Sequence, residues 1–169
     1  LSLALLIYNE YMTATKVLTK HLLEQITSND DLLFMTAVEI RILSRNTQTS
    51  PELARFLNEL DNTHFYLKET SATFGFFENL NRRYHLGLDK NQVYAVAVTN
   101  YAMVTSLQAA RRNGIIDCTN ESILRTGFSY FAKALSFDSA LIEKILDDSL
   151  SISEKMNISV GDNFQLRHR

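Results

Sequence analysis

The residues of this sequence whose side chains supply an imidazole or a thiol, for metal binding or nucleophilic attack, are four histidines and one cysteine: His21, His64, His85, His168 and Cys118. A nucleophile needs a base close by, but Cys118 has no base near it in the sequence. The motifs of phosphate-binding loops, dinucleotide-binding turns and nucleophile elbows do not occur. A di-iron bundle needs a glutamate followed by a histidine three residues later, and no glutamate here meets that condition. We therefore expect a protein that is not an enzyme.

Composition narrows the class of protein further. The chain has 169 residues, of which 46% are hydrophobic, and its formal net charge is -2. A disordered tail would be less apolar, and a nucleic-acid-binding domain would be more basic, so we expect no nucleic-acid partner. A single cysteine excludes an internal disulfide framework. Five glycines and one proline are few turn residues for a sheet protein, so the composition predicts a mostly helical chain.

Capping signals divide the chain into helices. Ser28, with two acids after it, is typical of a helix start, and so is Ser50 before a proline. Gly87 is typical of the left-handed residue that ends a helix. The expected helices cover residues 2–26, 28–45, 51–70, 76–85, 89–112 and 121–156, the last of them broken near 136–138.

The apolar pattern predicts an all-α fold, a single-domain helical bundle with no sheet. This domain covers residues 1–157, and residues 158–169 form a flexible C-terminal tail. Its core lies between the last two long helices, whose apolar residues recur at three-and-four spacing. The contact faces are Val93, Ala97, Tyr101, Val104 and Leu107 on one helix, and Leu124, Phe128, Phe131 and Leu135 on the other.

The first eight residues are apolar, but Glu10 ends this run well short of the roughly 20 residues that a membrane span needs. The run also lacks the charged start and the cleavage site of a signal peptide. We expect a cytoplasmic protein. A membrane becomes a partner only if these residues are the end of an anchor that begins upstream.

One apolar stripe runs along the C-terminal helix, and Ser149 stands where the heptad-like spacing would place another apolar residue. The stripe consists of Ile142, Ile145, Ile152 and Met156. This stripe either packs on its own domain or pairs two copies of the chain through the same patch. The second alternative predicts a homodimer through the C-terminal helix, which would carry a signal to a downstream partner that the sequence does not identify.

Aromatic residues are concentrated between positions 56 and 84: Phe56, Phe65, Tyr66, Phe74, Phe76, Phe77 and Tyr84. They form either a solid aromatic core or the walls of a flat apolar pocket between two helices. His64 shares one side of its expected helix with Leu57 and Leu60, so we expect its side chain to face the interior.

The short helix and turn after these aromatics carry the sequence Asn81-Arg82-Arg83-Tyr84-His85-Leu86-Gly87-Leu88-Asp89-Lys90-Asn91-Gln92-Val93-Tyr94. This segment resembles the proximal region of bacterial sensor globins, and the order of the expected helices resembles the globin layout. In that family a short helix carries the haem-ligating histidine, usually four residues before the glycine of the turn. Here Arg83 holds that position, and His85 stands two residues before Gly87. The ligand is therefore either His85, after a shortened turn, or lost, as in haem-free stressosome-type globin domains.

The resemblance implies a regulatory sensor domain with a globin-like fold that binds haem or another apolar ligand and signals through its helices. On this interpretation His85 is the metal ligand of a bound haem, and Phe56, His64, Phe77 and Tyr84 line the pocket with it. Without haem, His85 would be a helix-end histidine, which the negative end of the helix dipole favours. The alternative function is a helical protein–protein interaction module with no small-molecule ligand.

Overall fold

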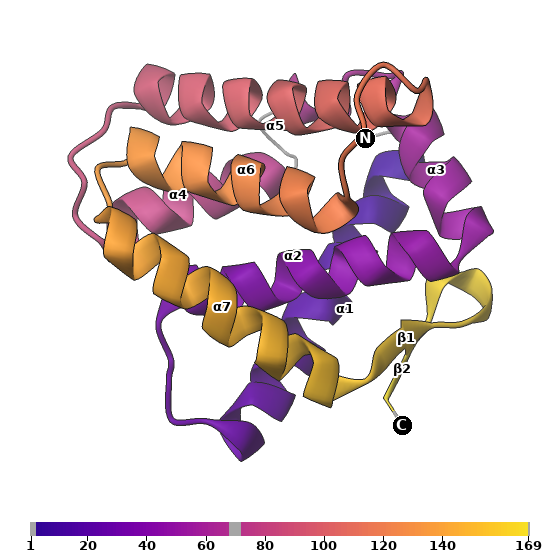
Figure 1. Cartoon of the computed structure of the whole chain (residues 1–169), viewed down its shortest axis with the longest axis horizontal. Helices are drawn as coiled ribbons and strands as arrows, with labels where there is room; N and C mark the ends of the chain where they lie inside the picture. The colour runs from indigo at the N-terminus through magenta and orange to yellow at the C-terminus, as the bar shows by residue number, and fades with distance from the viewer. Residues whose placement is uncertain (1–2, 68–71, 169) are drawn as a thin grey trace. The chain divides into compact units, whose positions relative to one another are not determined.

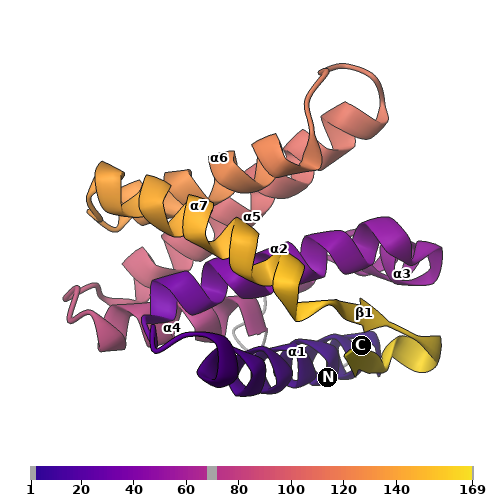
Figure 2. The same ribbon diagram turned by 60° about the horizontal axis from the view of Figure 1, so that its bottom comes forward.

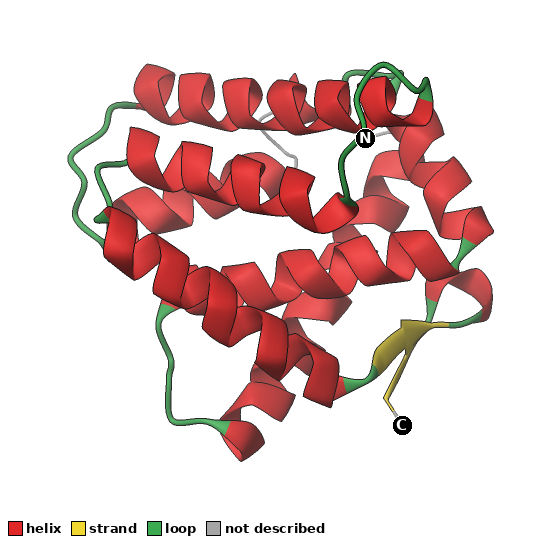
Figure 3. Cartoon of the chain, viewed as in Figure 1, coloured by secondary structure: helices red, strands yellow, loops and turns green. Residues whose placement is uncertain are grey.

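A computed structural model describes residues 3–67 and 72–168 of the chain. In these residues the chain forms seven α-helices, two short 3₁₀-helices and one two-stranded sheet (Figure 1, Figure 3). Helices account for most of the described residues, so the predicted all-α class is confirmed. The elements are α1 (Leu3–Ile26), α2 (Leu32–Thr49), α3 (Pro51–Asp61), η1 (Phe65–Leu67), α4 (Ala72–Arg83), α5 (Lys90–Arg112), α6 (Asn120–Ala134), α7 (Ser139–Met156), β1 (Ile158–Val160), η2 (Asp162–Phe164) and β2 (Leu166–His168).

The chain divides into two compact units. Unit 1 comprises Leu1–Phe65 together with Ile145–Arg169, and unit 2 comprises Tyr66–Lys144. Helix α7 therefore begins in unit 2 and ends in unit 1. The sequence pattern over residues 1–157 does not mark this division, because the helix passes the boundary without a capping residue or a break.

Helix α2 begins and ends later than the sequence predicts. Its N-cap is Asp31, whose side chain accepts a hydrogen bond from the Phe34 N–H at 2.9 Å, and the expectation of a cap at Ser28 is wrong. The helix continues past residue 45 to Thr49. The hydroxyls of Thr47 and Thr49 donate to carbonyls one turn earlier, so side chains expected in a polar loop are accommodated in the helix.

Helix α3 starts as predicted, because the Ser50 hydroxyl accepts a hydrogen bond from the Leu53 N–H at 3.2 Å. It ends at Asp61, whereas the sequence predicts a helix to residue 70; residues 68–70 lie outside the described part. His64 follows the end of the helix with a φ of 51°, and its side chain is exposed. The prediction that His64 faces the interior is therefore wrong, because helical spacing no longer applies at that position.

The C-terminal segment forms a β-hairpin, so the prediction of a chain without any sheet is wrong. Strands β1 and β2 pair antiparallel, with Ile158 opposite His168. Figure 2 shows β1 following α7 near the C-terminus of the chain. Each strand has three residues, which is too short for the alternation that marks a strand in a sequence. The hairpin is attached to unit 1 because Ile158 is buried and its carbonyl accepts a hydrogen bond from Arg45 at 3.2 Å.

The predicted contact between α5 and α6 is present and forms the core of unit 2, but the prediction of a single core there is wrong, because unit 1 buries apolar residues of its own. Phe131 is 1% exposed and makes edge-on contacts with Phe76, Phe77 and Phe128 at centroid distances between 4.9 and 6.0 Å. The predicted α6 face is buried throughout: Leu124, Phe128, Phe131 and Leu135. On the α5 face, Val93 and Ala97 are buried, and the three later residues are half-buried: Tyr101, Val104 and Leu107.

Three helices of unit 2 end in the same left-handed motif, with His85, Gly114 and Ser136 as the left-handed residue. After α4, for example, the Leu86 N–H donates to the Asn81 carbonyl at 3.1 Å. The prediction that Gly87 caps this helix is wrong, since His85 takes the capping position and Gly87 adopts its own φ of 70° in the following loop. His85 is thus a helix-end histidine.

We expect Ser136→Gly to stabilise the chain by about 0.5–1 kcal/mol, because a side chain at a φ of 66° is strained and glycine is not. Chemical denaturation measures the difference. The control is Ser151→Gly, an exposed position inside α7, which we expect to destabilise by a similar amount. Equal losses in both variants would contradict the assignment of Ser136 as a left-handed cap.

Candidate functional site

The structure distributes the predicted pocket residues over both units. Phe56 and His64 belong to unit 1, whereas Phe77, Tyr84 and His85 belong to unit 2. Phe56 is half-buried and packs on Phe164 at a centroid distance of 5.0 Å. The side chains of His64 and His85 are exposed.

The aromatic rings of unit 2 contact one another. Phe77 packs on Phe131 at 5.5 Å, and Tyr84 packs on Phe137 at 4.9 Å, both edge-on. A haem needs a flat apolar slot beside its histidine ligand, and rings in mutual contact fill the space that such a slot would occupy. These contacts favour the solid aromatic core that the sequence left open as an alternative, and the residues around His85 do not fit a haem.

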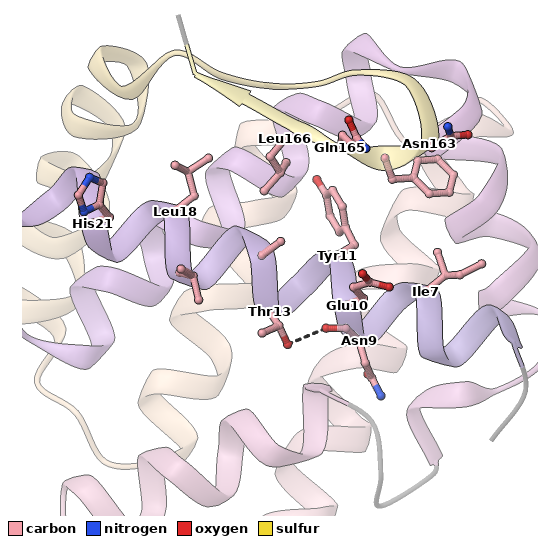
Figure 4. A pocket seen from close by; sticks show the side chains of 13 residues that line it. Ile7, Asn9, Glu10, Tyr11, Thr13, Leu18, His21, Asn163, Gln165 and Leu166 are labelled. Carbon is pink, nitrogen blue, oxygen red and sulfur yellow. Dashed lines mark hydrogen bonds between the residues drawn. The ribbon is translucent and has the colours of Figure 1, made fainter.

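An open groove of about 1140 Å³ lies in unit 1, between α1 and the C-terminal hairpin (Figure 4). One wall is a single face of α1, and the other is the end of the hairpin. The lining residues are Ile7, Asn9, Glu10, Tyr11, Thr13, Ala14, Val17, Leu18, His21, Asn163, Phe164, Gln165 and Leu166. Residues 7, 10, 14, 17 and 21 repeat every three or four positions, so they share one side of the helix along a length of about 21 Å.

Helix α1 has a second face, which holds it in unit 1. That face is buried and includes Leu5, Tyr8, Thr15, Thr19 and Leu22. The groove face carries exposed apolar surface instead: Val17 is 65% exposed, and Ile7 and Leu18 are half-buried. The sequence predicts a helix over residues 2–26 but assigns no binding site to it. The groove face of α1 follows from the same helical periodicity, whereas the hairpin that forms the other wall of the groove could not be predicted from it.

The hairpin wall is held by contacts within unit 1. The Phe164 ring packs on Phe56, and the Arg45 guanidinium donates to the carbonyls of Ser153 and Ile158 at 3.0 and 3.2 Å. The hairpin loop closes with a hydrogen bond of 2.7 Å from the Gly161 N–H to the Gln165 carbonyl. These bonds place Gln165 and its neighbours opposite α1.

A row of buried polar side chains lies behind the groove, where α1 packs on α2. Tyr11 lines the groove, and its hydroxyl accepts a hydrogen bond from the Asn46 side chain at 3.1 Å. The Thr15 hydroxyl donates to the Tyr11 carbonyl at 2.9 Å. Burial raises the pKa of the Tyr11 phenol, and the hydrogen bond with Asn46 opposes that change.

Glu39, on α2, is a buried carboxylic acid of unit 1. Its side chain is 8% exposed, and burial raises its pKa from 4.5 to about 7, while the positive charge of Lys16 on α1 opposes the rise. Among the described residues, all buried polar and charged residues belong to unit 1: Thr15, Thr19, Thr36, Glu39, Arg41, Asn46, Ser149 and Ser153. Unit 1 thus buries polar side chains among the apolar residues of its core, whereas the fully buried side chains of unit 2 are aromatic and aliphatic.

Arg41 joins α2 to the C-terminal part of α7. Its guanidinium donates to the Ser149 hydroxyl at 2.9 Å and to the Leu146 carbonyl at 2.7 Å. The stripe expected to pair two copies is largely covered within one chain, since Ile142, Ile145 and Met156 are buried. Ser149 is buried as well, and Ile152 is half-buried. This burial favours the intrachain packing that the sequence left open.

Residues 3–67 and 72–168 contain neither a cluster of metal ligands nor a helix that could span a membrane. No three His, Cys, Asp or Glu side chains there gather closely enough to hold a metal ion. No helix in the same residues combines the length and the apolar character that crossing a membrane requires. In comparisons with known proteins, no family model, no curated protein and no solved structure matches the chain.

Proposed function

We propose that the chain is a helical protein-interaction module whose unit 1 binds another amphipathic α-helix in the groove between α1 and the hairpin. The observation that carries this proposal is the shape of the groove. It follows one helix face for about four turns, from Ile7 to His21, and is open to solvent. An elongated apolar groove of this kind suits a helix, which inserts side chains at three-and-four spacing.

The lining of the groove supports this kind of partner. Val17 and Leu18 offer apolar surface in its middle, and Glu10 and His21 offer polar groups towards its two ends. An interface with an apolar centre and a polar rim is the usual arrangement between proteins. We expect the module to act in the cytoplasm, and the free thiol of Cys118 is compatible with that reducing compartment.

The proposal includes no catalytic step. Glu10 and His21 are an acid and a base of the groove, but they stand eleven positions apart on α1, about 16 Å along the helix axis. A general acid and base that act on one bond must both reach it by hydrogen bonds, and this separation is several times too long.

The test selects helix-forming peptides from a displayed library against the immobilised chain. We expect the selected peptides to carry apolar residues at three-and-four spacing and to lose most of their binding to a Val17→Asp variant. The control is Ile115→Asp, because Ile115 is 73% exposed and belongs to unit 2. Failure of the monomeric chain to select any peptide, or equal binding to both variants, would contradict the proposed function.

A second candidate is the sensor domain that the globin resemblance implies, with an apolar ligand such as haem in the same groove. The observation in its favour is that His21 lies on the groove wall beside Val17 and Leu18. Titration with haem would then produce a Soret band that His21→Ala abolishes and His85→Ala leaves unchanged. A Soret band that is lost in His85→Ala and kept in His21→Ala would instead identify His85 as the haem-ligating histidine, as the sequence predicts.

A further inference from the structure

We propose that the helix bound in the groove is α1 of a second copy of this chain, so that two α1 helices pack antiparallel across a two-fold axis between Ala14 and Val17. This inference rests on the proposed function and names its partner. A two-fold axis makes each copy offer the same groove to the other, which closes the assembly at a dimer.

The register of such a pair follows from the groove residues. An axis midway between positions 14 and 17 places Ala14 of one copy opposite Val17 of the other. The same axis places Thr13 opposite Leu18. In both pairs a small side chain meets a larger one, so the two helices can approach closely with their side chains interdigitated. All four residues line the groove.

Charge is complementary in this antiparallel register and not in a parallel pair in equal register. Glu10 of each copy comes opposite His21 of the other, so the pair occurs twice in the dimer. An imidazole N–H can donate to a carboxylate in either protonation state. In a parallel pair in equal register, each Glu10 would face the other Glu10, and like charges in contact oppose association. Both side chains are exposed in the single chain, where the His21 ring forms a hydrogen bond of 3.0 Å with the Gln25 side chain.

Exposure also favours α1 over the other helices. Among the described residues, α1 carries more exposed large apolar side chains than any other helix: Leu3, Leu6, Val17 and Ile26. The C-terminal stripe offers no comparable surface, because Ile142, Ile145 and Met156 are already buried. The hairpin wall, with Gln165 and Leu166, extends the contact beyond a single helix pair.

Sedimentation velocity over a range of concentrations tests whether a dimer forms. We expect the wild type to dimerise and Val17→Asp to raise the dissociation constant about a hundredfold, because it places a charge at the centre of the interface. Ile115→Asp is the matched control and should leave the dimer intact. Far-ultraviolet circular dichroism checks that both variants fold, as expected for substitutions at exposed positions.

Charge exchange tests the register. His21→Glu should raise the dissociation constant about tenfold, because it places two carboxylates opposite one another, and Glu10→Lys should raise it similarly, because it removes the carboxylate that accepts a hydrogen bond from the imidazole. The double variant should recover the wild-type value, since it places a lysine opposite a glutamate. If both single variants dimerise weakly and the double variant dimerises no more tightly than they do, this register is wrong.

Cross-linking tests the direction of the helices. In a Cys118→Ser background, chains carrying Glu10→Cys are mixed with chains carrying His21→Cys and then oxidised. The antiparallel pair predicts cross-links between the two kinds of chain and none within either kind, where the thiols lie about 16 Å apart along the helix axis. Cross-links between two Glu10→Cys chains would overturn the arrangement.

The failure of this inference can be told from failure of the proposed function. A wild type that stays monomeric while its groove still selects helical peptides would reject the second copy as partner and keep the interaction module. A dimer that Val17→Asp leaves unchanged would also reject the inference. A monomer whose groove selects no peptide would reject both.

Discussion

Replacing Phe131 with alanine is expected to lower the free energy of unfolding by about 3–5 kcal/mol, as large-to-small changes in a packed core do. The ring is 1% exposed and contacts three other aromatic rings of unit 2. Its removal would leave a cavity that aromatic neighbours on both α4 and α6 cannot close by small shifts, because rings change position less readily than flexible side chains. Chemical denaturation, followed by circular dichroism, gives the difference.

The matched control is Tyr130→Ala on the same helix. Tyr130 is 45% exposed, so its loss should cost less than about 1 kcal/mol. A loss of that small size for Phe131→Ala would show that the α5–α6 contact is not the core of unit 2. Similar losses for the two variants would point instead to a general effect of shortening side chains on α6.

Local side-chain-to-backbone bonds explain which helix boundaries the sequence predicts correctly. Asp89 accepts from the Gln92 N–H at 2.9 Å, and the Gln92 side chain accepts from the Asp89 N–H at 2.9 Å. Ser50 and Thr119 cap their helices in the same manner. Each bond involves residues two or three positions apart, so the residue types and their spacing are sufficient to predict it.

The cap of α2 shows where local patterns are ambiguous. Both Ser28 and Asp31 are good cap residues, and the two acids after Ser28 favour Ser28 in the sequence. In the structure the Asn29 side chain accepts from the Asp31 N–H at 3.0 Å, which extends the loop and leaves Asp31 as the cap. The left-handed His85 is a similar case, because glycine is the common residue there and histidine is not.

The candidate groove could be predicted only in part. The α1 stripe from Ile7 to His21 follows from helical periodicity, so the sequence contains one wall. The other wall depends on Arg45 binding the Ile158 carbonyl, 113 positions away. Such a bond has no local signature. The buried polar residues behind the groove have no local signature either, because the sequence pattern of a helix does not distinguish a buried glutamate such as Glu39 from an exposed one.

Glu39 is expected to make the chain less stable as the pH rises. Its pKa is about 7 in the folded chain, against an ordinary value of 4.5, because burial penalises the charged carboxylate. The folded chain therefore binds a proton that the unfolded chain has lost over the interval between these values. The contribution to stability is complete below about pH 4.5 and is lost as the pH rises to about 7. The difference corresponds to about 3 kcal/mol.

The variant Glu39→Gln tests this, because glutamine resembles the neutral carboxylic acid in shape and does not titrate. We expect it to exceed the wild type in stability by about 3 kcal/mol at pH 8 and to match it at pH 4. The control is Glu59→Gln at an exposed position of α3, where a change below about 0.5 kcal/mol is expected at both pH values. Urea denaturation at the two pH values measures all three proteins.

The positive charge of Lys16 lowers the pKa of Glu39 and so opposes the effect of burial. If the carboxylate ionises in place above pH 7, Lys16→Met removes the attraction that stabilises the charged form. The stability of this variant should then continue to fall with pH above about 7, where that of the wild type levels off. In the double variant with Glu39→Gln, the additional slope should disappear, since no titrating group remains for Lys16 to act on. An equal slope in wild type and Lys16→Met would show that Lys16 does not act on Glu39, and an unchanged slope in Glu39→Gln would show that another group causes the pH dependence.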